Sequence, residues 1–265
     1  MQCGAIMKRS TGLAWACVLS LVLISGCSSA SQTSSSTTAA TSGHLIVFAA
    51  ASLKKSFTDI GDQFKTDNPG SSVEFSFAGS WGLVNQLTGD PPADVFASAD
   101  TYNMDFAAKA GLLAGSPVNF ASNTLTIAVA PGNPKNITSF EDLTRSGLDV
   151  VVCAVPVPCG SAIQEVEQAT GVHLAPVSEE HSVTDVLDKV TTGQADAGLV
   201  YVTDAMGVGN KVTAVPFAEA SAAVNTYPIA VLRNSKNPGL ARKFVDMVTG
   251  PAGQKVLSAA GFAKP

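Results

Sequence analysis

The chain has 265 residues, of which 46% are hydrophobic and 14% are charged. Two of its 16 basic residues lie among the first 26, so the rest of the chain carries 14 basic and 21 acidic residues, a net charge of −7. An acidic surface argues against nucleic acid as a partner. Any anion bound here must be held by local dipoles, because the overall field repels it.

The first 26 residues have the features of a signal peptide. Lys8 and Arg9 precede an apolar run at 13–24, which is shorter than a membrane span needs. The run ends in ISGC, which resembles a lipobox, so Cys27 is the predicted lipidation site of an exported, membrane-anchored protein. The alternative is an ordinary signal peptide with an incidental cysteine. Residues 27–43 are rich in Ser, Thr and Ala and predict a flexible tether.

From residue 44 onward, predicted strands alternate with predicted helices. Continuous apolar runs predict buried strands, and apolar residues that recur every three or four positions predict amphipathic helices. The predicted strands are 45–50, 72–77, 94–99, 124–131, 148–155, 197–201 and 226–232. The predicted helices begin near residues 53, 83, 102, 162, 183, 239 and 254. This alternation is typical of α/β proteins with mostly parallel sheets.

Two of the five cysteines, Cys153 and Cys159, lie in the globular part of the chain. An exported protein meets an oxidising environment, so a disulfide across the proline-containing segment CAVPVPC is one expectation. Two buried thiols are the other. A site for a bare metal cation such as zinc is not expected, because no histidine or further cysteine lies near this pair in the sequence.

Small or polar residues stand at four junctions between a predicted strand and a predicted helix. These junctions are at Ser52, Ser80, Cys159 and the Ser182-Val183 pair. The start of a helix presents unpaired N–H groups and the positive end of the helix dipole, and parallel strands direct such starts to one sheet edge. Helix starts that converge would form an anion site without a cation. Each serine by itself is also consistent with simple helix capping.

Several motifs resemble those of the periplasmic molybdate-binding proteins of ABC importers. They are VFAAASL at 47–53, FAGS at 77–80, PADVFASAD at 92–100, VPCG at 157–160, and the segment from SVTDVL to GLVYVTDA at 182–205. The C-terminal GPAGQKVLSAAGF at 250–262 belongs to the same pattern. The resemblance covers nearly all of residues 44–265.

This resemblance implies a type II periplasmic-binding-protein fold, with two α/β lobes joined by two crossover strands. Lobe I would comprise residues 44–123 plus 228–265, and lobe II residues 124–227. A tetrahedral oxyanion would lie between the lobes. Its ligands would be the hydroxyl and amide groups of Ser52 and Ser80, the backbone amides of Cys159 and Val183, and the hydroxyl of Tyr201.

The implied function is capture of molybdate, or of tungstate, for a membrane permease driven by an ATPase. The resemblance implies no cofactor, no catalysis and a monomeric protein. A site made only of donors suits an oxyanion without a proton, because the hydroxyl of hydrogen phosphate would stay unpaired at a cost of about 1–3 kcal/mol. Sulfate stays open as an alternative, since it differs from molybdate chiefly in size.

Three other functions are consistent with parts of the sequence. Ser52 and Lys55 fit the S-x-x-K motif of penicillin-binding proteins and β-lactamases, which form an acyl-enzyme, but the accompanying S-D-N and K-T-G elements are absent from the sequence. The tether would also suit a purely structural surface lipoprotein. A receptor for another small solute is the third alternative.

Overall fold

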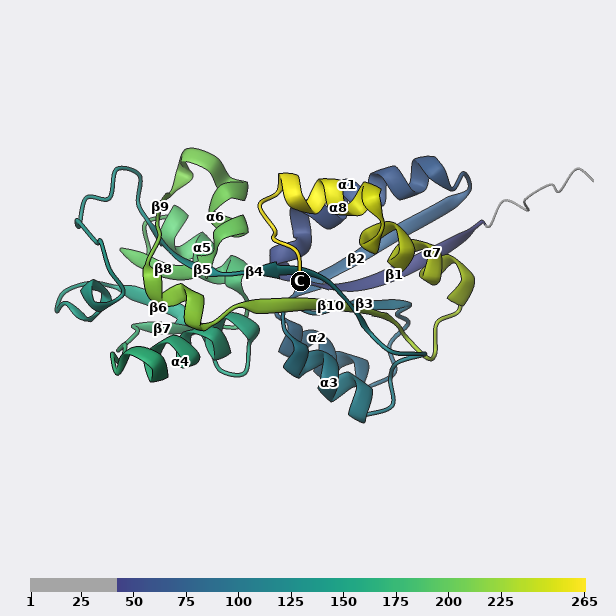
Figure 1. Cartoon of the computed structure of the whole chain (residues 1–265), viewed down its shortest axis with the longest axis horizontal. Helices are drawn as coiled ribbons and strands as arrows, with labels where there is room; N and C mark the ends of the chain where they lie inside the picture. The colour runs from purple at the N-terminus through teal and green to yellow at the C-terminus, as the bar shows by residue number, and fades with distance from the viewer. Residues whose placement is uncertain (1–41) are drawn as a thin grey trace, which may run out of the picture. The chain divides into compact units, whose positions relative to one another are not determined.

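The computed structural model describes residues 42–265, which contain two five-stranded sheets flanked by helices (Figure 1). The strand order is β2-β1-β3-β10-β4 in the first sheet and β7-β6-β8-β5-β9 in the second. Strands β4 and β10 pair with each other in the first sheet, and β5 of the second sheet begins two residues after β4 ends. The predicted signal peptide, the lipidation site at Cys27 and nearly all of the predicted tether lie outside the described residues.

The first sheet and its helices come from both ends of the described chain. Its strands are β1 (Gly43–Ala50), β2 (Ser71–Ala78), β3 (Val95–Ala97), β4 (Val118–Asn123) and β10 (Asn225–Val231). Its helical elements are η1 (Ala51–Leu53), α1 (Lys54–Asp67), α2 (Ser80–Leu87), α3 (Thr101–Lys109), α7 (Pro238–Thr249) and α8 (Pro251–Ala259). One apolar core joins the sheet to α1, α7 and α8, and a second joins it to α2 and α3.

The second sheet is built from the middle of the chain. Its strands are β5 (Leu125–Val129), β6 (Val150–Cys153), β7 (Ser178–Glu180), β8 (Ala197–Tyr201) and β9 (Thr213–Val215). Its helical elements are η2 (Glu141–Thr144), α4 (Pro158–Thr170), α5 (Val183–Thr191), α6 (Val202–Val208), η3 (Gly209–Lys211) and η4 (Ala218–Ala222). A single apolar core joins these elements, apart from β7 and η3, and Ala51 of η1 packs into it from the first sheet's side.

Both sheets are mixed, and in each of them four strands run in one direction and a single strand runs in the other, in agreement with the expectation of mostly parallel sheets. In the first sheet β1 runs parallel to β2 and β3, whereas β10 runs antiparallel to β3 and β4. In the second sheet β6 runs parallel to β7 and β8, whereas β5 runs antiparallel to β8 and β9. The antiparallel strands β5 and β10 adjoin the two passages of the chain between the sheets, where no βαβ crossover sets the strand direction.

The α/β class and the main predicted elements are confirmed, and most element ends lie within three residues of the prediction. The pattern missed β4, β7, β9 and α6. Strands β7 and β9 have three residues each, which is too short for a periodic signal. The sequence of β4, VNFASN, contains two asparagines and a serine, which favour turns, and α6 spans only two turns.

Helix α1 forms because Phe57, Ile60 and Phe64 lie on one face, next to Leu53 at the end of η1, and each of the four is at most 1% exposed. Phe57 is at the centre of an aromatic cluster, where its ring lies 5.8–6.3 Å from those of Phe75, Phe120 and Phe244. The cluster fixes the position of α1 against the first sheet. No helix within residues 42–265 is long and apolar enough to cross a bilayer.

Replacing Phe57 with alanine removes the central ring of this cluster. We expect Phe57→Ala to lower the free energy of unfolding by about 3–5 kcal/mol, through lost burial and the cavity left behind. Tyr102→Ala is the control, because Tyr102 is 59% exposed and its removal should change stability by less than about 0.5 kcal/mol. Urea denaturation measures both, and equal effects would contradict the packing described here.

Candidate anion-binding site

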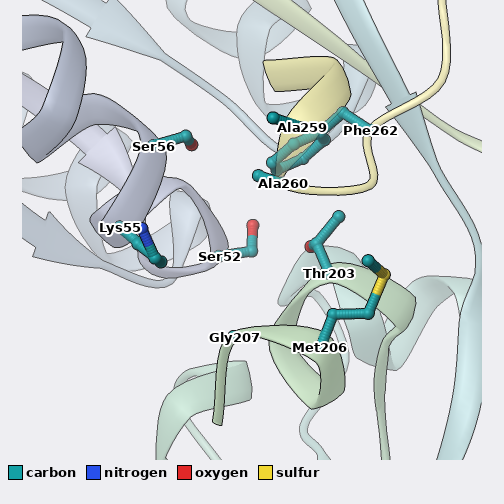
Figure 2. Close-up of a pocket in the computed structure, with 9 residues that line it drawn as sticks. All are labelled: Ser52, Lys55, Ser56, Thr203, Met206, Gly207, Ala259, Ala260 and Phe262. Carbon is teal, nitrogen blue, oxygen red and sulfur yellow. The ribbon is translucent and has the colours of Figure 1, made fainter. Parts of the chain in front are cut away.

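Three hollows have Ser52 in their lining, and they differ in their other residues. One of them, of about 400 Å³, lies between α1, α5 and α6, and another, of about 120 Å³, lies between α1, α6 and the end of α8 (Figure 2). The lining of the latter includes the apolar side chains of Met206 and Phe262. The Lys55 ammonium, which also faces it, is paired with Asp59 at 2.9 Å. Of the five predicted ligand residues, only Ser52 lines this hollow.

The smallest of the three hollows brings together all five predicted ligand residues. Its volume is about 10 Å³, far below the roughly 300–1,000 Å³ typical of sites for drug-sized ligands. Its lining residues, none of them charged, are Ala50, Ala51, Ser52, Gly79, Ser80, Ala99, Val157, Pro158, Cys159, Val183 and Tyr201. The space therefore suits a small ion, and the residues around it offer only neutral groups.

Four helix starts border this cavity, two from each sheet. They are the starts of η1 and α2 beside the first sheet and of α4 and α5 beside the second. In α4 the Ser161 N–H donates to the Val157 carbonyl at 3.0 Å, so the Cys159 N–H precedes the first bond of the helix. In α5 the Val186 N–H donates to the Ser182 carbonyl at 3.4 Å, so the Val183 N–H stands in the same position. These amides are available for an anion.

Tyr201 supplies a hydroxyl that no described residue pairs. The side chain is 1% exposed, and its Oη has no hydrogen-bond partner among residues 42–265. Burial raises the pKa of this hydroxyl well above its ordinary value, so it keeps its proton at neutral pH. A buried donor left unpaired costs about 1–3 kcal/mol, which a ligand that accepts the hydrogen bond would recover.

Ser80 is fully buried, and its hydroxyl already accepts one hydrogen bond. The Ala99 N–H donates to Ser80 Oγ at 3.0 Å. Ser80 is the first residue of α2, and Gly79 rather than Ser80 occupies the cap position. The hydroxyl hydrogen of Ser80 has no acceptor among the described residues, so it remains available to a ligand.

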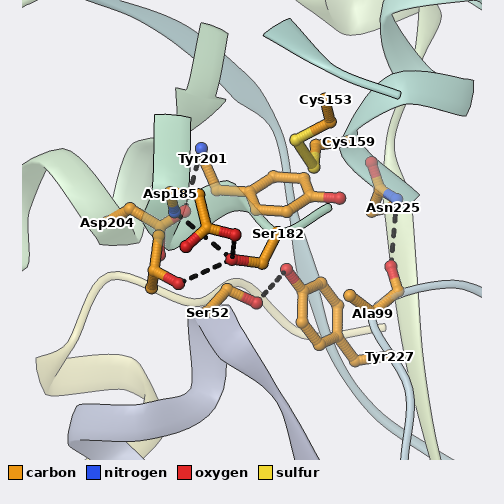
Figure 3. The surroundings of a disulfide bond; sticks show 11 residues. Ser52, Ala99, Cys153, Cys159, Ser182, Asp185, Tyr201, Asp204, Asn225 and Tyr227 are labelled. Atoms are coloured by element: carbon orange, nitrogen blue, oxygen red, sulfur yellow. Dashed lines mark hydrogen bonds between the residues drawn. A yellow bond between two sulfur atoms is a disulfide. The ribbon is translucent and has the colours of Figure 1, made fainter. Parts of the chain in front are cut away.

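Ser52 does not cap a helix either, contrary to the simplest interpretation of the sequence. It lies inside η1, and its Oγ is 3.0 Å from Tyr227 Oη (Figure 3). Either hydroxyl can donate to the other, which leaves one hydrogen of the pair for a ligand. Of the junction serines, only Ser182 is a side-chain cap, since its Oγ accepts from the Asp185 N–H at 3.2 Å.

Cys153 and Cys159 form a disulfide that joins the end of β6 to the first turn of α4 (Figure 3). Their Cα atoms are 5.6 Å apart, and both side chains are buried. The bond closes the short segment that presents the Cys159 N–H, which restricts the conformations open to that segment.

Sequence reasoning missed Tyr227 and Asp204. Tyr227 is fully buried, and its ring packs edge-on against that of Tyr201, with centroids 6.0 Å apart. The Asp204 carboxylate accepts a hydrogen bond from the Tyr201 N–H at 3.1 Å. Burial raises the pKa of Asp204 to about 7. The sequence holds no signal for either role, because Tyr227 has the pattern of an ordinary strand residue and Asp204 lies in α6, a helix that the pattern missed.

The neutral donors come from helix starts beside two sheets, and two passages of the chain join these sheets. This arrangement is that of the two-lobe solute-binding proteins. Family comparison agrees with this class. Residues 45–263 match the family of bacterial extracellular solute-binding proteins, and the chain belongs to that family.

Individual relatives are consistent with this placement. The chain is 60% identical to the molybdate-binding protein ModA of Mycobacterium tuberculosis H37Rv over 257 residues, which make up 97% of this chain and 98% of the relative. The periplasmic molybdate-binding protein of Azotobacter vinelandii shares the fold, with a TM-score of 0.72 at 21% identity over 83% of this chain and 99% of the other. The sulfate-binding protein SubI of M. tuberculosis is nearly as similar, with a TM-score of 0.71 at 20% identity over 83% and 86%.

The raised pKa of Asp204 predicts a pH-dependent stability. The pKa of this carboxyl is near 3.8 in the unfolded chain and about 7 in the folded protein. The protonated form therefore contributes to the free energy of unfolding at acid pH, and this contribution is lost as the pH rises through about 7. Asp204→Asn keeps an acceptor for the Tyr201 N–H and removes the charge. Between pH 4 and pH 8, wild type should lose on the order of 4 kcal/mol relative to this variant. Urea denaturation across that range measures it, and parallel curves for the two proteins would contradict the assignment.

Proposed function

We propose that this protein captures molybdate outside the cytoplasm and hands it to a membrane permease driven by an ATPase. The observation that carries the proposal is the buried, unpaired Tyr201 hydroxyl, which faces a cavity with neutral donors from both sheets and no charged lining residue. A molybdate ion without a proton accepts hydrogen bonds from every one of these groups. The 60% identity to a protein named for molybdate binding supports the same choice.

The proposed ligands are the hydroxyl and amide groups of Ser52 and Ser80, the amides of Cys159 and Val183, and the Tyr201 hydroxyl. All of them line one cavity. We propose that lobe I comprises residues 44–123 plus 228–265 and lobe II residues 124–227. The sheets support this division, with one adjustment: β10 begins at Asn225, so residues 225–227 pair within the first sheet.

Further parts of the proposal concern the cell envelope. Lipidation at Cys27 would anchor the protein, and residues 27–43 would act as its tether. Tungstate is proposed as a second ligand, since it is also a tetrahedral oxyanion. The protein is proposed to act as a monomer and to catalyse no reaction.

An acyl-enzyme built on Ser52 and Lys55 is disfavoured. The Ser52 hydroxyl pairs with Tyr227, and the Lys55 ammonium pairs with Asp59 and is exposed. A nucleophilic serine needs a base within hydrogen-bond reach. Sulfate is the stronger competing ligand, because the sulfate-binding and molybdate-binding structures match this fold almost equally well.

A panel of oxyanions tests the proposed ligand. Bound ligand stabilises the folded protein by RT ln(1 + [L]/Kd), about 2.7 kcal/mol at a hundredfold excess over Kd. Molybdate and tungstate should therefore raise the melting temperature at micromolar concentrations, whereas phosphate should not. An equal shift with sulfate would overturn molybdate specificity, and no shift with any of these ions would overturn the function.

Tyr201→Phe tests the unpaired hydroxyl directly. The change removes a donor to the ligand, so molybdate affinity should fall by about 1–3 kcal/mol, roughly 5- to 150-fold. The ligand-free variant should be at least as stable as wild type, because a buried unsatisfied group is lost. Ser56→Ala is the control: Ser56 is buried in α1, but its hydroxyl donates to the Leu53 carbonyl and does not line the cavity. Calorimetric titration gives the affinities, and unchanged binding in Tyr201→Phe would remove Tyr201 from the site.

A further inference from the structure

Gly79 is a buried glycine at the junction of β2 and α2, directly before Ser80, and it lines the anion cavity. Its backbone angles are φ −60° and ψ 139°. Any L-residue adopts this conformation without strain, so the backbone does not require glycine here. The reason for a missing side chain must lie in the surroundings.

Those surroundings belong to the other sheet. A Cβ placed on Gly79 would lie 2.2 Å from the carbonyl oxygen of His181 and 3.2 Å from Val157 Cγ1. The first distance is far inside van der Waals contact. The obstructing atom is a backbone oxygen between β7 and the Ser182 cap of α5, so it cannot turn away as a side chain would.

The contact lies between the two halves of the proposed site. Gly79 precedes Ser80, a proposed ligand from the first lobe, and His181 stands two residues before Val183, a proposed ligand from the second. Moving the Gly79 and His181 backbones apart would therefore also separate Ser80 from Val183. An anion held from both sides is sensitive to such a change, because hydrogen bonds weaken steeply beyond their normal length.

One other described glycine faces the opposite lobe, and it is a weaker candidate. A Cβ on Gly261 would meet Met206 Sδ at 2.7 Å, but a thioether side chain can move, and the φ of +97° at Gly261 favours glycine for a separate reason. At Gly79 only the approach of the second lobe excludes a side chain.

We propose that Gly79 is a positioning residue that sets how closely the two lobes approach, so that the oxyanion can be enclosed only because this position has no Cβ. The proposal rests on the proposed function for its ligand. It assigns Gly79 no contact of its own with the anion. Its effect is transmitted through the distance between the donors of the two lobes.

Gly79→Ala tests this, with Gly82→Ala as the matched control. Gly82 lies one turn along the same helix, and a Cβ there meets nothing within 4 Å. Gly79→Ala should bind molybdate at least tenfold more weakly by calorimetry, and its ligand-free melting temperature should not fall. The compaction that molybdate produces in wild type, measured as radius of gyration by small-angle X-ray scattering, should be reduced. Gly82→Ala should match wild type in affinity and compaction.

Several results would overturn the proposal. Wild-type affinity and compaction in Gly79→Ala would show that the lobes tolerate the Cβ. A large drop in its ligand-free melting temperature would assign the glycine to folding within one lobe. Absence of molybdate binding in wild type would instead refute the proposed function. In that case the lobes have no anion to enclose, and the inference about Gly79 is refuted together with the function.

Discussion

Hydrogen bonding by neutral donors is the constraint on which this structure depends. Beyond its first 26 residues the chain carries a net charge of −7, so its overall field opposes any anion that approaches. The residues around the cavity offer hydroxyl and amide donors, and no charged side chain lines it. Such donors have a fixed direction and count, so a site built from them would favour ligands that accept hydrogen bonds from every side. The same arrangement disfavours an anion with a proton of its own.

The topology explains how such donors come together. Each helix start follows closely after a strand, so the sheet fixes the position of its first N–H groups. Two sheets contribute two starts each, and residues from both line one cavity. The two chain passages next to β4 and β10 allow the sheets to be separate packing units with separate cores. A ligand between such units stabilises the arrangement in which both touch it.

Much of this was predictable from the sequence, because its signals are local. The apolar face of α1 and the continuous run of β1 follow from periodicity, and the positions of Ser52, Ser80, Cys159, Val183 and Tyr201 follow from junctions and family resemblance. What could not be predicted depends on contacts between distant segments. Tyr227 pairs by a hydrogen bond with Ser52, which lies 175 residues away in the sequence, and Gly79 beside the first sheet contacts His181 beside the second. The direction of β10 could not be predicted either, because an apolar run has the same pattern in a parallel and in an antiparallel strand.

The most direct test is a crystal structure of the protein with molybdate, in which anomalous scattering at the molybdenum edge locates the metal. One molybdenum is expected in the small cavity. The molybdate oxygens should lie within hydrogen-bond distance of Tyr201 Oη, Ser80 Oγ and the amides of Cys159 and Val183, and no lysine or arginine should touch them. Molybdenum in either of the two larger hollows beside Lys55, or contacts to one lobe alone, would contradict this assignment.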